Sequence, residues 1–125
     1  WLYYSLRSAI PDGGVSMLHF APEMGLEERL SRIGGLRRVT ADLFSSFVDL
    51  RTDLMFLPFR DASSDVIHCS HVLEHVADDH QGLRELRRVA EVHPSAAVNH
   101  LKVIQRYIKS RNQEARCHAH ALSQV

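Results

Sequence analysis

Residues 65–89, DVIHCSHVLEHVADDHQGLRELRRV, switch from one hydrophobic period to another. Residues 65–70 alternate and are rich in β-branched side chains, which predicts a strand. Over residues 79–89 the apolar side chains recur at helical spacing, which predicts an amphipathic helix. Ligands of open α/β sheets bind beyond the carboxyl ends of strands. The turn at residues 70–75 is therefore where a binding or reacting site is expected.

The same alternation of strand and helix runs through the chain before this stretch. Strands are predicted at residues 15–20, 36–42, 48–52 and 65–70, and helices at 1–9, 26–33 and 79–89. Strands that alternate with helices pair in parallel through right-handed crossovers. The sequence therefore predicts an α/β fold with a doubly wound, mostly parallel sheet of about four strands.

The chain divides into three segments by character. Residues 1–14 are interpreted as the end of a helix and a turn, and residues 15–89 as the α/β domain. Residues 90–125 form a divergent tail, in which a basic amphipathic helix is predicted after Ser95. The apolar stripe of that helix consists of Val98, Leu101, Ile104 and Ile108.

Composition excludes several classes of protein. Fifteen basic residues balance fifteen acidic ones, so no global field indicates nucleic acid or an anionic membrane as the partner. No apolar run approaches the ~20 residues of a membrane span, and no signal peptide is evident. Cys69 and Cys117 are expected to be reduced thiols in a cytoplasmic protein. The chain begins at Trp1 and is expected to be an internal piece of a longer one.

The loop after the first strand and the end of the second strand suggest a nucleotide-type ligand. Close approach of backbone to a cofactor favours glycine, and this loop keeps only Gly25, with Ala21 and Glu23 at positions where glycines are expected. Asp42 ends the second strand, where a carboxylate can accept hydrogen bonds from ribose hydroxyls. The alternative interpretation is that Asp42 caps the following turn.

Asp53 is a second carboxylate at a strand end. It can accept a hydrogen bond from an adenine amino group while Leu54 and Met55 pack on the ring. The alternative is a turn aspartate beside three apolar side chains of the core, Leu54, Phe56 and Phe59.

Three runs, MLHFAPEMGLEERL, VTADL and DLMFLPFRDASSDVIHCSHVLEHVADDHQGLRELRRV, closely resemble the class I S-adenosylmethionine-dependent methyltransferases. The type 11 branch with the motifs LHxAPE, LPF and HVLEHVxDD in this order is the most similar. The resemblance covers about residues 15–89. It implies a Rossmann-like fold, S-adenosyl-L-methionine as cofactor, and methyl transfer to a small-molecule or unknown acceptor.

The resemblance also implies roles for individual residues. The implied cofactor contacts come from strand ends and their loops: Ala21, Pro22, Glu23 and Gly25 around the methionine part, Asp42 at the ribose, Asp53 and Leu54 at the adenine, and Ser70 near the methyl group. His71 and His75 are the candidate catalytic residues, because either can serve as a general base for an acceptor that must lose a proton.

The chain departs from the family pattern at both ends of the resemblance. His19 stands where the first strand usually ends with an acid, and the pattern stops after Val89. Without a fifth strand, the strand at 65–70 becomes an exposed edge that favours self-association unless the tail covers it. A non-catalytic remnant that binds a cofactor or partner is therefore an alternative to an active enzyme.

A zinc peptidase is a third interpretation. His71-Val72-Leu73-Glu74-His75 fits the H-x-x-E-H signature, which needs both histidines on one helical face and a third ligand downstream. Glu114 is the only glutamate beyond residue 91. A second cluster of potential ligands, Cys117, His118 and His120, lies near the end of the chain. No metal is expected at either cluster.

Overall fold

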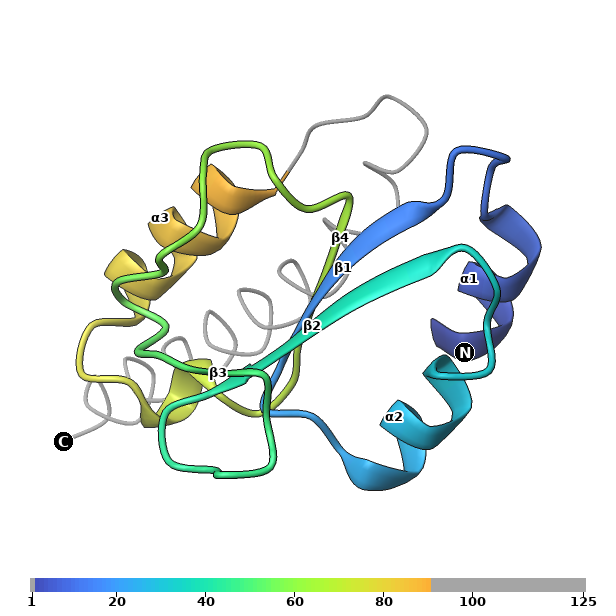
Figure 1. Ribbon diagram of the computed structural model, residues 1–125. Coiled ribbons are helices and arrows are strands. Elements are labelled where there is room, and N and C mark those ends of the chain that lie inside the picture. The colour runs from blue at the N-terminus through green and yellow to red at the C-terminus, as the bar shows by residue number, and fades with distance from the viewer. Residues whose placement is uncertain (1, 91–125) are drawn as a thin grey trace, which may run out of the picture.

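The computed structural model describes residues 2–90, which form one four-stranded parallel sheet in the order β3-β2-β1-β4 (Figure 1). The strands are β1 (Val15–Phe20), β2 (Leu36–Asp42), β3 (Leu50–Arg51) and β4 (Val66–Cys69). The helices are α1 (Leu2–Ala9), α2 (Met24–Leu30) and α3 (Asp79–Val89), with a 3-10 helix, η1 (Leu73–His75).

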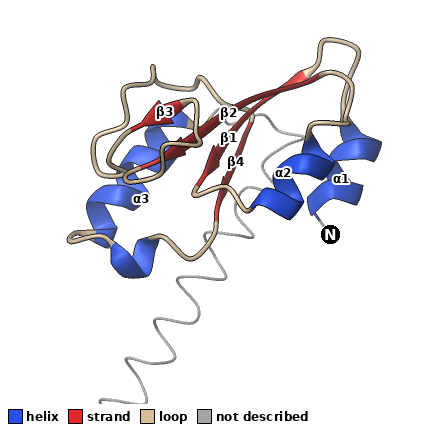
Figure 2. Cartoon of the chain, turned by 60° about the horizontal axis from the view of Figure 1, so that its bottom comes forward, coloured by secondary structure: helices blue, strands red, loops and turns tan. Residues whose placement is uncertain are grey.

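Helices cover both faces of the sheet. Helices α1 and α2 lie on one face and α3 lies on the other (Figure 2). β1 pairs with β2 on one side and β4 on the other, so the central strand lies between partners that come later in the chain. The predicted fold class, a Rossmann-like doubly wound sheet, is confirmed.

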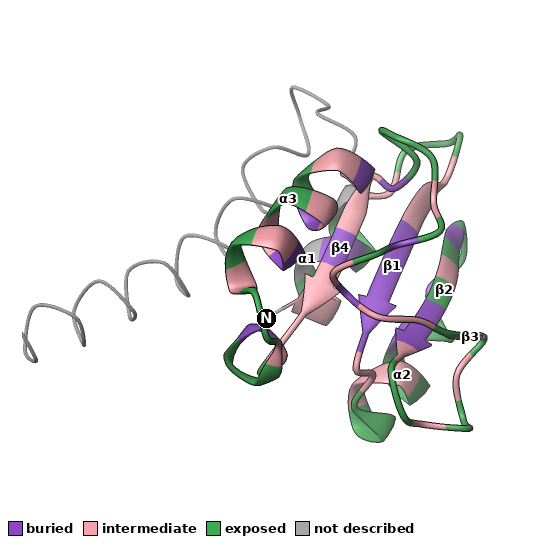
Figure 3. Cartoon of the chain, turned by 90° about the vertical axis from the view of Figure 1, so that its left-hand side faces the viewer, coloured by how far each residue is buried: buried purple, intermediate pink, exposed green. Residues whose placement is uncertain are grey.

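The core consists of two clusters separated by the sheet. Alternate side chains of β1 point to opposite faces, so Met17 packs with α1 and α2, whereas Leu18 and Phe20 pack with α3. The buried positions follow the centre of the sheet and the inner side of the helices (Figure 3). Fully burying a side chain of this size stabilises the fold by about 1.5–3 kcal/mol.

Helix α3 has the bounds predicted from its periodicity, residues 79–89. Leu86 and Val89 are buried, and Asp78 caps the helix by accepting a hydrogen bond from the Gln81 amide at 2.9 Å. Three other elements differ from the prediction. Helix α2 spans Met24–Leu30 instead of 26–33. The Arg32 and Ile33 amides bond the carbonyls three residues before them, so the chain tightens into turns there.

The predicted strand at 48–52 is shorter than expected, because it contains only the two residues of β3. The Thr40 amide of β2 donates to the Asp49 carboxylate at 2.8 Å, so a side chain replaces the backbone partner and the ladder begins one residue later. β4 begins at residue 66 instead of 65, because the Asp65 side chain binds Ser16. It ends at residue 69, two residues before the left-handed backbone of His71.

Within residues 2–90, β4 forms one edge of the sheet and β3 the other. The edge predicted for this strand is therefore present in the described part of the chain. The tail helix predicted after Ser95 lies outside the described residues. None of the helices in residues 2–90 is long and apolar enough to cross a membrane.

Candidate functional site

The carboxyl ends of the parallel strands bring most of the candidate residues to one edge of the sheet. Residues 21–23 follow β1, Asp42 ends β2, residues 52–54 follow β3, and residues 70–71 follow β4. Three non-glycine residues among those described have left-handed backbone, and two of them, Ala21 (φ 52°) and His71 (φ 55°), lie at this edge. Strained backbone of this kind is characteristic of ligand-binding turns.

The loop between β1 and α2 is short and held at its start. The Ala21 amide donates to the Ala41 carbonyl of β2 at 2.8 Å, which holds the start of the loop against the sheet. Pro22 and Glu23 complete the loop, and Glu23 stands at the N-cap of α2 without a side-chain capping bond. Gly25 lies in the first turn of α2, where an added Cβ would meet no atom within 4 Å. The space beside Gly25 is therefore open.

Asp42 uses one carboxylate oxygen to hold the turn after β2. Its Oδ1 accepts hydrogen bonds from the Phe44 and Ser45 amides, each at 2.7 Å. In the part of the chain that the structure describes, Oδ2 has no hydrogen-bond partner. Asp42 therefore caps the turn through Oδ1, as the alternative interpretation predicted, and Oδ2 remains available to accept a hydrogen bond from a ligand.

Asp53 has the same arrangement after β3. Its Oδ1 accepts from the Met55 amide at 2.9 Å, and Oδ2 makes no hydrogen bond to residues 2–90. Leu54 is 1% exposed and packs in the core beside Gly82, as the alternative interpretation expected. Phe56 is 69% exposed, in contrast to the interpretation that placed it in the core.

The turn after β4 brings two histidines to one glutamate. Glu74 Oε1 lies 3.2 Å from His71 Nδ1 and 4.0 Å from His75 Nε2. Both histidine side chains are largely exposed, 83% for His71 and 77% for His75. Ser70, at the end of β4, is partly buried. A carboxylate that orients an imidazole is the arrangement of a general base.

The helix that a zinc peptidase requires is not observed at this turn. Leu73–His75 is a 3-10 helix, and His71 precedes it with left-handed backbone, so the histidines do not share an α-helical face. In residues 2–90, no three His, Cys, Asp or Glu side chains are grouped so that they could hold a metal ion. Glu114 and the cluster at residues 117–120 lie outside the described residues.

The sequence prediction missed a buried polar network on the α1/α2 side of the sheet. His19, 0% exposed, has its Nδ1 2.8 Å from Glu27 Oε2 of α2. Glu27 Oε1 accepts from Arg38 Nε of β2 at 2.7 Å. Burial works against ionisation of Glu27, but the hydrogen bonds from Arg38 and His19 outweigh it and lower its pKa. The only sequence signal was His19 at a position that the family usually fills with an acid.

His68 of β4 lies beside His19 in register, with ring centroids 5.0 Å apart. Neither His19 Nε2 nor His68 Nδ1, both buried, has a hydrogen-bond partner in the described part of the chain. Burial and the neighbouring His19 lower the pKa of His68, against a smaller opposing effect of Glu23.

Cys69 is a free thiol that lies on the opposite side of β4 from His68. Burial, with a smaller contribution from the negative charge of Glu74, raises the pKa of Cys69 to about 12. The thiolate is therefore scarcely populated at neutral pH, and Cys69 is unsuited to be a nucleophile.

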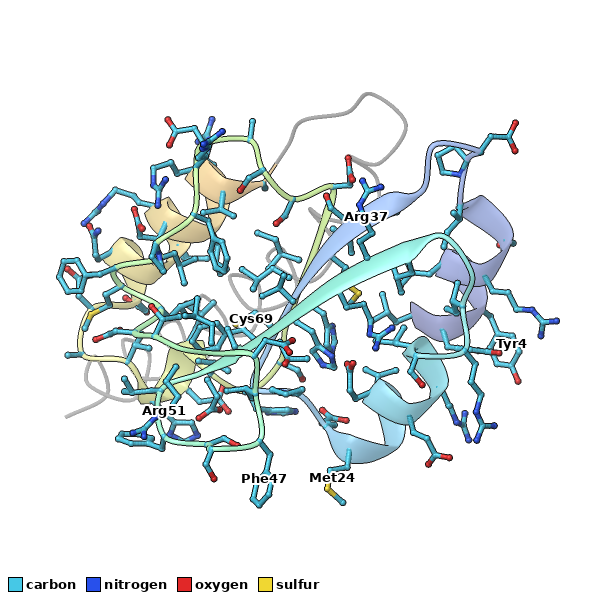
Figure 4. All side chains as sticks on the ribbon, viewed as in Figure 1. Tyr4, Met24, Arg37, Phe47, Arg51 and Cys69 are labelled. Atoms are coloured by element: carbon cyan, nitrogen blue, oxygen red, sulfur yellow. The ribbon has the colours of Figure 1, made fainter. Side chains whose placement is uncertain are left out.

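Exposed apolar side chains surround this edge of the sheet. Met24 is 87% exposed and Phe47 is 95% exposed; Met24 projects from the first residue of α2 and Phe47 from the loop between β2 and β3 (Figure 4). Phe44, in the same loop as Phe47, is 81% exposed. Large apolar groups in water mark surfaces that contact ligands or other proteins more often than other surfaces.

Comparisons with known proteins agree with this architecture. One similar structure, described as an S-adenosyl-L-methionine-dependent methyltransferase from Methanococcus maripaludis, has a TM-score of 0.58 and 12% identity over 72% of this chain and 49% of that one. The YcgJ protein from Bacillus subtilis has a TM-score of 0.56 and 19% identity over 72% of this chain and 45% of its own. At these identities the likeness shows the fold alone.

A third similar chain belongs to the complex between the Haloferax volcanii Trm112 methyltransferase activator and a methyltransferase. Its TM-score is 0.51, with 22% identity over 70% of this chain and 46% of that one. The present chain thus spans about half the length of the solved structures that it matches. No curated protein matches the sequence. The family model described as "Methyltransferase domain" matches residues 29–93, more than half of the sequence. The chain belongs to this methyltransferase domain family.

Proposed function

We propose that residues 15–89 bind S-adenosyl-L-methionine at the carboxyl edge of the sheet, and that the protein transfers its methyl group to an acceptor. The observation that carries the proposal is the meeting of strained loops and carboxylates at that edge. Ala21 and His71 have left-handed backbone there, and Asp42 and Asp53 each keep a carboxylate oxygen without a partner among the described residues. Membership of the methyltransferase family supports the same conclusion.

The donor and acceptor chemistry of this edge fits the cofactor. Ribose hydroxyls and an adenine amino group are hydrogen-bond donors, and unpaired carboxylate oxygens are the acceptors that they require. We assign Asp42 Oδ2 to the ribose and Asp53 Oδ2 to the adenine. Leu54, next to Asp53 in the chain, is buried and supports this loop by packing in the core. We assign Ala21, Pro22, Glu23 and Gly25 to the methionine part. The open space beside Gly25 supports close approach there.

The bound cofactor would supply an electrophilic methyl group on a sulfonium. Ser70 and His71, after β4, would border the position of that methyl group. For an acceptor that must lose a proton, His71 would act as the base, held by Glu74 Oε1 at 3.2 Å from its Nδ1. His75 lies further along the turn and would face the acceptor. A cytoplasmic location and a small-molecule acceptor remain predictions.

Calorimetric titration of S-adenosyl-L-methionine into the full chain tests the cofactor site. Asp42→Asn keeps an oxygen that can accept from the Phe44 and Ser45 amides, and it replaces the second oxygen with a donor. The turn should survive, and the dissociation constant should rise about tenfold, because a hydrogen bond to a charged group is lost. Asp12→Asn, an exposed aspartate before β1 at the opposite end of the strands, should bind as the wild type does.

Failure of the folded wild-type chain to bind the cofactor would refute the proposal, as would equal affinities for Asp42→Asn and Asp12→Asn. Binding alone does not establish catalysis. Transfer of labelled methyl from the bound cofactor to a panel of small-molecule and protein acceptors tests the reaction itself. Binding without transfer to any acceptor would favour the alternative of a non-catalytic cofactor-binding protein.

A further inference from the structure

The polar network beneath the cofactor loop joins three elements through one carboxylate. Glu27, in the first turn of α2, binds His19 of β1 through Oε2 and Arg38 of β2 through Oε1. Arg38 also donates from Nη1 to the Leu30 carbonyl at the end of α2, at 3.2 Å. Both ends of this short helix are therefore fastened to the two central strands through side chains.

The helix has few other polar constraints at its start. Glu23 stands at the N-cap but makes no side-chain capping bond, so no capping side chain stabilises the first turn. Only residues 21–23 separate β1 from α2, and Ala21 has left-handed backbone. The path of this loop consequently depends on where the first turn of α2 lies relative to β1.

His19 is the member of the network that belongs to the loop's own strand. Its side chain is completely buried, and it lies two residues before Ala21. The Glu27 carboxylate can only accept from the imidazole, so His19 Nδ1 carries the proton of this hydrogen bond. The geometry thus links the residue at the end of β1 to the first turn of α2 across the loop.

We infer that His19 and Glu27 are positioning residues that set the loop at 21–25 in the conformation that receives the cofactor. The inference rests on the proposed function, because it assigns a task to residues that support the cofactor loop without contacting the reacting atoms. The hydrogen bond between the His19 imidazole and the Glu27 carboxylate holds α2 against β1. Glu27 from α2 and His68 from β4 face His19, and Arg38 of β2 lies beyond Glu27. Glu23, before α2, interacts electrostatically with His68.

A matched pair of substitutions separates positioning from bulk packing. His19→Asn places an amide N–H near the position of Nδ1 and can still donate to Glu27, whereas His19→Leu fills similar space without a donor. We expect His19→Leu to raise the dissociation constant for S-adenosyl-L-methionine about tenfold, and His19→Asn to remain within about threefold of the wild type. Measurements are made on samples that circular dichroism shows to be fully folded.

Hydrogen exchange of the amides at 21–27 in the cofactor-free chain gives a second readout. Exchange should quicken about tenfold in His19→Leu and return near the wild-type rate in His19→Asn, while exchange in β2 changes little. Were His19→Leu not to fold, Glu27→Gln would replace it, since Glu27 is partly exposed and the amide conserves its shape. Glu27→Gln should change both readouts in the same direction.

The two readouts distinguish failure of this inference from failure of the proposed function. A wild-type chain that does not bind the cofactor refutes the proposed function, and hydrogen exchange then decides whether His19 sets the loop. A cofactor-binding wild type whose His19→Leu variant binds equally well refutes the positioning role. Faster exchange throughout the sheet, with no selective change at 21–27, would also refute the positioning role, because it would show that His19 contributes only to global stability.

Discussion

The substitution Thr40→Val tests the polar clamp that closes the loop between β2 and β3. Thr40 and Asp49 bind each other reciprocally. The Thr40 amide and Oγ1 donate to Asp49 Oδ2 at 2.8 and 2.7 Å, and the Asp49 amide donates to Thr40 Oγ1 at 3.0 Å. Asp42 is the last residue of β2, and its Oδ1 caps the turn that begins this loop. The clamp therefore stabilises the loop that carries the proposed ribose ligand.

Valine has nearly the shape of threonine and removes two of the three hydrogen bonds. A bond to a charged group contributes about 1.5–3 kcal/mol and a neutral one about 1 kcal/mol. Asp49 is exposed, so water replaces the lost donor and the charge-assisted bond contributes at the low end or below. The new methyl group, in a side chain 8% exposed, recovers about 0.8 kcal/mol. The net loss of unfolding free energy should be about 1 kcal/mol.

The effect should depend on pH in a defined direction. Hydrogen bonds from the Thr40 amide and hydroxyl lower the pKa of Asp49 below its ordinary value of 3.8. A carboxyl with a lowered folded-state pKa stabilises the fold above its unfolded pKa, and this contribution disappears as pH falls through the folded-state value. The difference between wild type and Thr40→Val should therefore be largest near neutrality and should narrow as pH falls below 3.8.

Urea denaturation at pH 7 measures the loss, and thermal melts down to acid pH measure its pH dependence. A loss of 1 kcal/mol corresponds to a decrease of about 4 °C in melting temperature for a domain of this size. Thr52→Val is the matched control, because the Thr52 hydroxyl makes only long contacts, at 3.3 and 3.5 Å. Equal melting temperatures for Thr40→Val and wild type, or equal losses in the two variants, would refute the clamp.

Four further outcomes follow from exposure, strain and pKa. Ala62→Gly should raise the unfolding free energy by about 0.5 kcal/mol in urea denaturation, because Ala62 is exposed with left-handed backbone (φ 51°). Phe47→Ser, at a side chain 95% exposed, should change it by less than about 0.5 kcal/mol. Cys69 should resist iodoacetamide at pH 8 until the chain is unfolded, by peptide mass spectrometry, because its pKa is raised to about 12. Self-association through the β4 edge should appear as concentration-dependent sedimentation.

The fold was predictable wherever apolar spacing decides structure. The apolar stripe of α3 predicted both ends of the helix. The buried side chains of the stripe mark its last turn, and the N-cap marks its start. The alternation of strands and helices gave the parallel pairing. The short β3 was not predictable, because Asp49 is separated from Thr40 by a loop and only the folded chain shows that its carboxylate replaces a ladder bond.

The site was predictable only in part. Position at a strand end predicted Asp42 as a candidate ribose ligand, and the structure was needed to show that its Oδ1 caps a turn while Oδ2 has no partner in residues 2–90. Leu54 was expected beside a ligand, and its side chain lies in the core. The network around Glu27 joins residues of three elements that are separate in the sequence, so no local sequence pattern predicts it.

The polar contacts of the sheet are distributed unevenly along its strands. At the amino ends of β1 and β4, Asp65 Oδ2 accepts from both the amide and the hydroxyl of Ser16, and the Asp65 amide donates back to that hydroxyl. The clamp on β2 repeats this pattern, and the network around Glu27 fastens α2. At the carboxyl edge, by contrast, Asp42 and Asp53 each use Oδ1 to cap a turn, and their Oδ2 atoms have no partner among the described residues. Strand positions that are fixed elsewhere allow this edge to hold strained backbone and unpaired acceptors, which is the condition for a preorganised binding site.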